Sequence, residues 1–205
     1  MNHNSKLCCF INKNENWREL LQNEYKINVK EEYPFAIFNY GIDSDFSDLI
    51  VQEARGIIID LENLEVVCWP FRKFGNYNEN YADNIDWNTA RVQDKIDGSI
   101  IKLWWNRTTG KWQLSTNRTI NAGTALANQM TQETFLDVIR KADNYNEIAL
   151  KLPIFNKDYT FIFELVSPET QVVVKYPKPY LYHIGTRNNI SGMEEDSDIG
   201  IEKPK

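Results

Sequence analysis

The stretch DKIDGSIIKLWWNRTTGKWQL, residues 94–114, combines a lysine, a turn signal and two β-rich runs. Asp97 and Gly98 favour a sharp turn, because glycine tolerates backbone conformations closed to other residues and aspartate hydrogen-bonds to nearby backbone. The runs SIIKLWWN and KWQL are rich in β-branched and aromatic residues, which predicts a hairpin closed around Thr109 and Gly110. Lys95 is therefore expected at the edge of a loop, facing a cleft, just before the first of the two strands.

Short β-rich runs continue on both sides of this hairpin. They are AIFNY (36–40), RGIIID (55–60), EVVCWPF (65–71), YTFIFELV (159–166), QVVVKY (171–176) and YLYHIG (180–185). Apolar residues at helical spacing predict a helix near residues 15–26 and helical structure over 124–152. The polar, acidic end of the chain, 188–205, is expected to be a loop or an interrupted element. The pattern predicts an α+β protein built on antiparallel sheet.

Composition narrows the class of protein. The 205 residues are 42% hydrophobic, enough for a substantial core, and the net charge of -6 argues against coating nucleic acid through bulk charge, although a local basic cleft stays open. Three cysteines without paired CxxC spacing and two histidines argue against a zinc site, and Cys68 is expected in the core. With no signal sequence and no run near the ~20 apolar residues of a membrane span, we expect a soluble cytoplasmic protein.

Three further residue patterns suggest chemistry at Lys95, whose amine becomes a nucleophile only when neutral. EARGIIID (53–60) places Arg55 before an apolar strand, WPFRKFGNYNE (69–79) places Arg72 and Lys73 among aromatics, and TFIFELV (160–166) contains Glu164. A lone carboxylate in so apolar a strand needs a partner or a metal. The alternatives are a solvated turn lysine, an arginine on a surface hairpin and an outward glutamate on an edge strand.

Together with DKIDGS, these stretches resemble the ATP-dependent RNA ligases of the covalent nucleotidyltransferase superfamily, most closely the phage-type RNA ligase 1 branch. The resemblance runs from about residue 36 to 187. It implies an α+β, antiparallel-sheet nucleotidyltransferase fold, of the ATP-grasp-like or DNA ligase-like adenylation type, with flanking helices. It also implies an enzyme that uses ATP as substrate, Mg²⁺ as cofactor and RNA ends, a 5'-phosphate and a 3'-hydroxyl, as partners, with neither membrane nor zinc.

The resemblance also implies roles for individual residues. Lys95 would attack the α-phosphorus of ATP and carry AMP, which passes to the RNA 5'-phosphate before the 3'-hydroxyl displaces it. Glu164 would contact the ribose or the metal. The residues implied to bind ATP and its phosphates are Arg55, Lys73, Arg118, Asp97, Gly98 and Ser99. Gly75 departs from the family, which has an aromatic there. Which residue of Tyr182, His183 and Ile184 faces the adenine is left open, because they alternate along one strand.

Two later family motifs, an E-G-hydrophobic strand and a K-x-K strand, do not occur before Lys205. The expectation is a single adenylyltransferase domain over 1–205 that lacks the last nucleotide-binding motifs and any C-terminal specificity domain. It is either a piece of a longer reading frame or a degenerate relative, encoded by a phage or virus and acting in the host cytoplasm. The alternatives are a DNA ligase, a capping-type guanylyltransferase, or a non-enzymatic β-rich module that grips a sugar or base with Trp104, Trp105 and Trp112.

Overall fold

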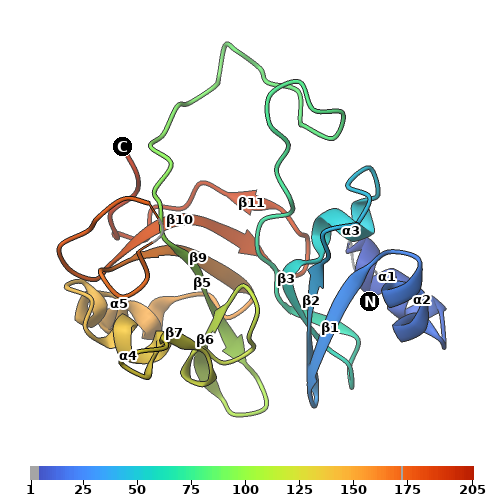
Figure 1. Cartoon of the computed structure of the whole chain (residues 1–205), viewed down its shortest axis with the longest axis horizontal. Coiled ribbons are helices and arrows are strands. Elements are labelled where there is room, and N and C mark those ends of the chain that lie inside the picture. The colour runs from blue at the N-terminus through green and yellow to red at the C-terminus, as the bar shows by residue number, and fades with distance from the viewer. Residues whose placement is uncertain (1–4, 172) are drawn as a thin grey trace.

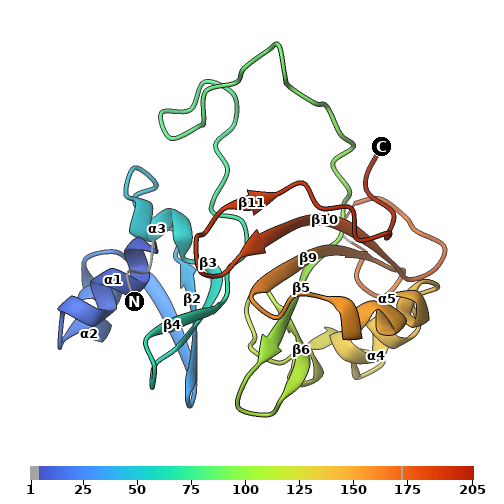
Figure 2. The same cartoon turned by 180° about the vertical axis from the view of Figure 1, so that it is seen from behind.

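The computed structural model describes residues 5–171 and 173–205 and is an α+β protein of antiparallel sheets, as the sequence predicts. In this part of the chain, a four-stranded sheet has the order β1-β2-β3-β4, a five-stranded sheet has the order β11-β10-β9-β5-β6, and β7 and β8 form a small ribbon. Figures 1 and 2 show the two larger sheets side by side, each with its helices on the side away from the other sheet.

The first sheet comes from the N-terminal part of the chain. Its strands are β1 (Ile27–Glu32), β2 (Phe35–Tyr40), β3 (Arg55–Asp60) and β4 (Glu65–Cys68), and its helices are α1 (Lys6–Lys13), α2 (Trp17–Asn23) and α3 (Leu49–Glu53). Leu7, Leu21, Phe38 and Ile57 are among the buried residues of the core between helices and sheet. Ser5 caps α1 and also donates a hydrogen bond to the buried Glu53 carboxylate at 2.8 Å, which joins α1 to α3.

The second sheet carries the hairpin that the sequence predicts. Its strands are β5 (Ser99–Asn106), β6 (Lys111–Thr116), β9 (Tyr159–Val166), β10 (Tyr180–Asn188) and β11 (Glu194–Glu195). Against it lie α4 (Phe135–Arg140), α5 (Tyr145–Lys151), the short turns η1 (Ala122–Thr124) and η2 (Leu152–Ile154), and the ribbon of β7 (Leu126–Asn128) and β8 (Glu133–Thr134). A capping box between Thr134 and Asp137 starts α4.

Alternation along β9 explains how an apolar strand can carry the Glu164 carboxylate. Phe161, Phe163 and Leu165 belong to the core under α4 and α5. Residues two apart share a face of a strand, so Glu164 lies on the opposite face together with Thr160. The Thr160 hydroxyl accepts a hydrogen bond from the Trp69 backbone N–H at 2.8 Å, just beyond β4. Glu164 therefore lies on the face of the second sheet that is turned toward the first sheet.

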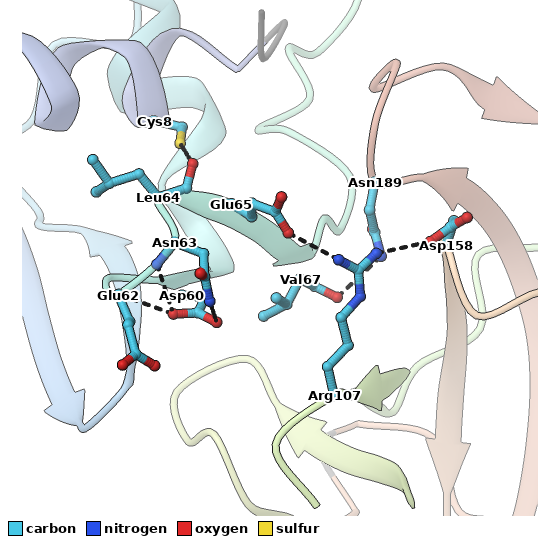
Figure 3. A network of polar contacts seen from close by, with 10 residues as sticks. All are labelled: Cys8, Asp60, Glu62, Asn63, Leu64, Glu65, Val67, Arg107, Asp158 and Asn189. Atoms are coloured by element: carbon cyan, nitrogen blue, oxygen red, sulfur yellow. Dashed lines mark hydrogen bonds and ion pairs between the residues drawn. The ribbon is translucent and has the colours of Figure 1, made fainter. Parts of the chain in front are cut away.

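The two large sheets are joined by a buried cluster and by polar bridges. Ile58, Cys68 and Trp104 are among the buried residues between them. Figure 3 shows Arg107 of the β5–β6 hairpin between Glu65, at 2.9 Å, and Asp158, at 3.0 Å. These ion pairs are partly exposed, so the buried cluster contributes more to the unfolding free energy than they do.

A buried lysine makes another bridge between the sheets. Lys102 in β5 is completely buried, and its ammonium donates a hydrogen bond to the Gly56 carbonyl in β3. Burial lowers the pKa of Lys102 to about 8. The sequence alone does not single out Lys102, because polar residues commonly alternate with apolar ones along a strand.

The structure corrects several predictions about local elements. QVVVKY is not a strand over its described residues 171 and 173–176, because the backbone N–H groups of Val173 and Val174 each donate to the Asp97 carboxylate at 2.7 Å instead of to a neighbouring strand. The first part of the predicted 124–152 helix forms η1, β7 and β8, and the helix predicted near 15–26 spans only Trp17–Asn23. Elements α1, β1 and α3 were not predicted.

Trp104 is also corrected. It is fully buried between the sheets and packs edge-on against Phe35 at 5.2 Å between ring centroids, so it is not exposed for ligand binding. Trp112 is partly buried, and its indole N–H donates to the Leu152 carbonyl at 3.0 Å. The binding-module alternative requires all three tryptophans to be exposed, and the burial of Trp104 therefore argues against it. Over residues 5–171 and 173–205, no helix is long and apolar enough to cross a membrane.

Residues 69–98, all described, connect β4 to β5 without a helix or strand. In Figure 1 this segment, coloured teal to green, arches away from both sheets before it returns to β5. Near its end, the Asp94 N–H donates to the Lys205 carbonyl at 2.6 Å, and Arg91 pairs with Asp196 at 2.9 Å. The C-terminal segment therefore holds the connection just before Lys95.

Candidate functional site

The turn after Lys95 is fixed by hydrogen bonds from distant parts of the chain. The Asp97 carboxylate accepts the N–H groups of Val174 and Val173, and these bonds lower the pKa of Asp97. The Gly98 N–H donates to the Glu164 carboxylate at 3.2 Å. Lys95 itself is exposed, two residues before the anchored aspartate. The turn is thus held between the 173–174 backbone and strand β9.

Gly98 is required by the close approach of this turn to β9. A Cβ atom at this position would lie 2.9 Å from the Leu165 carbonyl carbon and closer still to its oxygen. Both atoms belong to the backbone of a strand paired on both sides, so they cannot move away. Only glycine lets the backbone N–H reach Glu164 from this position.

Glu164 is the electrostatic centre of the site. Partial burial raises its pKa to about 7, while the Gly98 N–H and the positive charges of Lys95 and Arg55 act in the opposite direction; the Asp97 charge adds to the increase. The groups that act on this carboxyl come from β3 and from the end of the 69–98 connection. The fold therefore brings Lys95, Arg55 and Glu164 into one electrostatic neighbourhood.

A pH-dependent stability follows from Glu164. Because its pKa is raised from 4.5 to about 7 by folding, its contribution to stability is full below about pH 4.5 and is lost as the pH rises through about 7. Glu164→Gln removes this titration, so the unfolding free energy of the variant relative to the wild type should increase between pH 5 and pH 8. Denaturant unfolding at both pH values measures this, with Glu62→Gln on an exposed turn as the control. An equal difference at both pH values would contradict the assignment.

A cavity of about 490 Å³ lies beside the Lys95 turn. Its lining includes Gly98 and Ser99 at the start of β5, Arg118 after β6, and Glu164. Ala125, Leu126 and Phe135 also line it. The cavity thus brings together four of the residues implied by the family resemblance, with one exposed guanidinium and one partly buried carboxyl among them.

Arg55 and Lys73 occupy different surroundings. The Arg55 guanidinium donates to the Arg72 carbonyl at 3.3 Å and lies 5.1 Å from the ring centroid of Phe74. The Lys73 ammonium lies over the rings of Phe46, at 5.5 Å, and Tyr81, at 5.8 Å. Lys73 is therefore held among aromatics beside the first sheet, whereas the charge of Arg55 acts on Glu164.

At Gly75, the aromatic of the family pattern has no room. A Cβ atom at this position would lie 2.8 Å from both Cα and Cβ of Ala82, because the 69–98 connection folds back on itself there. Glycine at this position therefore allows the close approach of the chain to Ala82.

The strand β10 settles which of its residues shares a face with Glu164. Tyr182 is paired directly opposite Glu164, so their side chains lie on one face of the sheet. His183 is buried on the other face, where its ring lies 5.6 Å from that of Phe163. Of Tyr182 and His183, Tyr182 is thus the one on the face that carries Glu164.

Within the described residues, no group of three or more His, Cys, Asp or Glu side chains is arranged to hold a metal ion. Mg²⁺ commonly binds through one or two carboxylates plus the phosphates of its substrate. Glu164 fits this mode, since Asp97 already accepts two backbone hydrogen bonds.

Comparison with known proteins identifies the family. A family model described as RNA ligase matches residues 53–203, which include the Lys95 turn, Glu164 and Tyr182. The chain belongs to this RNA ligase family. The matched residues include all the candidate site cations and carboxylates discussed above, which are Arg55, Lys73, Lys95, Arg118, Asp97 and Glu164.

Two viral relatives support a phage-type RNA ligase. A protein of Autographa californica nuclear polyhedrosis virus named "Putative bifunctional polynucleotide kinase/RNA ligase" is 27% identical over 194 residues, covering 84% of this chain and 27% of that protein. An RNA ligase of Rhodothermus phage RM378 is 23% identical over 191 residues, covering 79% of this chain and 43% of the phage protein. The chain thus spans less than half the length of these relatives.

Some residues of the site have no signal in the sequence. The Tyr176 hydroxyl accepts a hydrogen bond from the Asp97 N–H at 3.4 Å, and Val173 and Val174 act only through their backbone. Contacts of this kind depend on the path of the chain rather than on residue type, so the residue types alone do not predict them.

Proposed function

We propose that this chain carries the nucleotidyltransferase chemistry of an ATP-dependent RNA ligase, on the adenylation-domain fold implied by the family resemblance. The observation that supports it best is the hydrogen bond from Gly98 of the K-x-D-G turn to Glu164, with the charges of Lys95 and Arg55 acting on the same carboxyl. A nucleophilic amine, a phosphate-binding cation and an acceptor for ribose or metal are the groups that nucleotidyl transfer needs.

In the proposed first step, Lys95 Nζ loses a proton to solvent and attacks the α-phosphorus of ATP. A nitrogen–phosphorus bond forms, the bond from the α-phosphorus to the bridging oxygen breaks, and pyrophosphate leaves with the electron pair. AMP then passes to an RNA 5'-phosphate, which frees the lysine. A 3'-hydroxyl finally attacks that phosphate, forms the phosphodiester and releases AMP.

The other residues have supporting roles in this proposal. Arg55 and Arg118 bind phosphate oxygens, since a guanidinium offers paired donors, and Lys73 contributes positive charge from its place beside the first sheet. Asp97, Gly98 and Ser99 shape the turn, and Tyr182 stacks on the adenine. Glu164 holds the ribose or, with the phosphates of ATP, Mg²⁺, which would neutralise the phosphate oxygens. The viral relatives favour an enzyme that is encoded by a phage or virus. Its place of action in this proposal is the host cytoplasm.

The nucleotide preference tests this function. We expect incubation of the chain with Mg²⁺ and α-labelled ATP to give a labelled protein band at 24.1 kDa after denaturing electrophoresis, and α-labelled GTP to give none. Pyrophosphate should remove the label by reversing the step. Transfer from GTP would instead indicate a capping-type guanylyltransferase, and sealing of DNA ends but not RNA ends after labelling by ATP would indicate a DNA ligase.

A further inference from the structure

Two large aromatic side chains meet on the outside of the 69–98 connection. Tyr77 is 68% exposed and Trp87 is 70% exposed, although they lie within 5.9 Å of each other, measured between ring centroids, at an angle of 76°. Exposed rings of this size, paired with one another and free of the protein core, are unusual on a protein surface. The arrangement leaves ring faces open to a ligand.

Each ring is held by its own hydrogen-bonded turn. Tyr77 lies in the turn Asn76–Glu79, where the Glu79 carboxylate accepts from the backbone and side chain of Asn76 at 2.6 and 2.8 Å. Trp87 lies in a turn closed by the Asp86 carboxylate, which accepts from the Asn88 N–H at 3.0 Å. The connection is therefore ordered locally around both rings, and long loops with such local order commonly carry a function.

Charge does not explain the exposure of this pair. Residues 69–98 contain slightly more acidic than basic side chains, and Arg72 is paired with Asp83 at 2.6 Å. Glu79 and Asp86 are used as acceptors in the two turns. A ligand of the pair must therefore be recognised by the faces of the rings, as unpaired bases are.

We propose that Tyr77 and Trp87 form a stacking platform for the unpaired bases of the RNA end that is joined at Lys95. The identity of this ligand rests on the proposed function. The connection that presents the rings leads directly to the nucleophile, and the eight residues from Trp87 to Lys95 can span at most ~29 Å of extended chain. A short single-stranded end bound at the rings therefore has the site within reach. Stacking accepts any base, so the platform adds affinity without sequence preference.

Binding of a short single-stranded RNA with a 5'-phosphate and a fluorescent 3' label, followed by anisotropy, tests this. The double variant Tyr77→Ala/Trp87→Ala should bind at least about tenfold more weakly, by the same factor at low and high salt, because stacking releases no counterions. The ring-preserving variant Tyr77→Phe/Trp87→Phe should keep the wild-type affinity. Tyr33→Ala is the matched control, since Tyr33 is 78% exposed on the β1–β2 turn.

The outcomes separate this proposal from the proposed function. Labelling by ATP should be the same in the double variant and the wild type. Unchanged RNA affinity, a loss that disappears at high salt, or no RNA binding by the wild type would each overturn the platform. Unchanged RNA affinity with altered self-association would assign the rings to a contact between copies. Ring-dependent RNA binding without any labelling by ATP would sustain the platform while rejecting the proposed adenylation.

Discussion

Lys95→Ala is expected to lower formation of the covalent AMP adduct by at least about a thousandfold, because removing an attacking group leaves only binding. Lys95→Arg should be equally inactive, since it keeps the positive charge but not the amine nucleophile. Both variants are assayed by labelling with α-labelled ATP and Mg²⁺. Lys95 is exposed, so neither substitution should change the unfolding free energy by more than about 0.5 kcal/mol.

Lys102 is the rival that this experiment has to exclude, because its pKa is lowered to about 8. It is completely buried between the sheets and bonded to the Gly56 carbonyl, so ATP has no access to its amine. Mass spectrometry of the labelled peptide should therefore place AMP on Lys95. Lys111→Ala, at the exposed end of the hairpin, serves as the lysine control. Wild-type labelling of Lys95→Ala would show that another residue carries the nucleotide.

Local sequence patterns predict the elements whose hydrogen bonds and burial depend on residues that are close in the sequence. The hairpin around Gly110 forms because its two strands are adjacent in sequence and rich in β-formers. Strand β9 is predicted by its apolar run, and the carboxyl within that run makes Glu164 a candidate site residue from the sequence alone. A turn in K-x-D-G is predicted from Asp97 and Gly98 themselves, although the hydrogen bonds that fix it in the fold come from Val173, Val174 and Glu164.

The remaining features depend on contacts between distant segments. Val173 and Val174 have strong β propensity, but the Asp97 carboxylate takes their N–H groups from 76 and 77 residues away. Helix α1 is stabilised by the carboxylate of Glu53, which accepts from Ser5 Oγ and from the Leu7 N–H. Neither arrangement can be inferred from a short stretch of sequence, because the hydrogen-bond partner is distant in the sequence and is brought close only by the tertiary fold.

Gly98→Ala is expected to be nearly as damaging as loss of the nucleophile. The new methyl group would overlap the carbonyl of Leu165 in β9, which is paired with both β5 and β10 and cannot retreat. The turn has to move instead, which breaks the Gly98–Glu164 hydrogen bond and displaces Lys95. A displacement of about 1 Å costs about a hundredfold in rate, so adduct formation should fall by at least that factor. The unfolding free energy should fall by about 1–3 kcal/mol.

Gly110→Ala distinguishes this effect from a general cost of replacing glycine. No atom lies within 4 Å of a Cβ placed on Gly110, although its φ of +64° adds a strain of about 1 kcal/mol. This variant should therefore lose some stability while labelling at the wild-type rate. If Gly98→Ala is folded and labels within twofold of the wild type, the turn can shift without loss of geometry. The contact with β9 would then have no part in positioning Lys95.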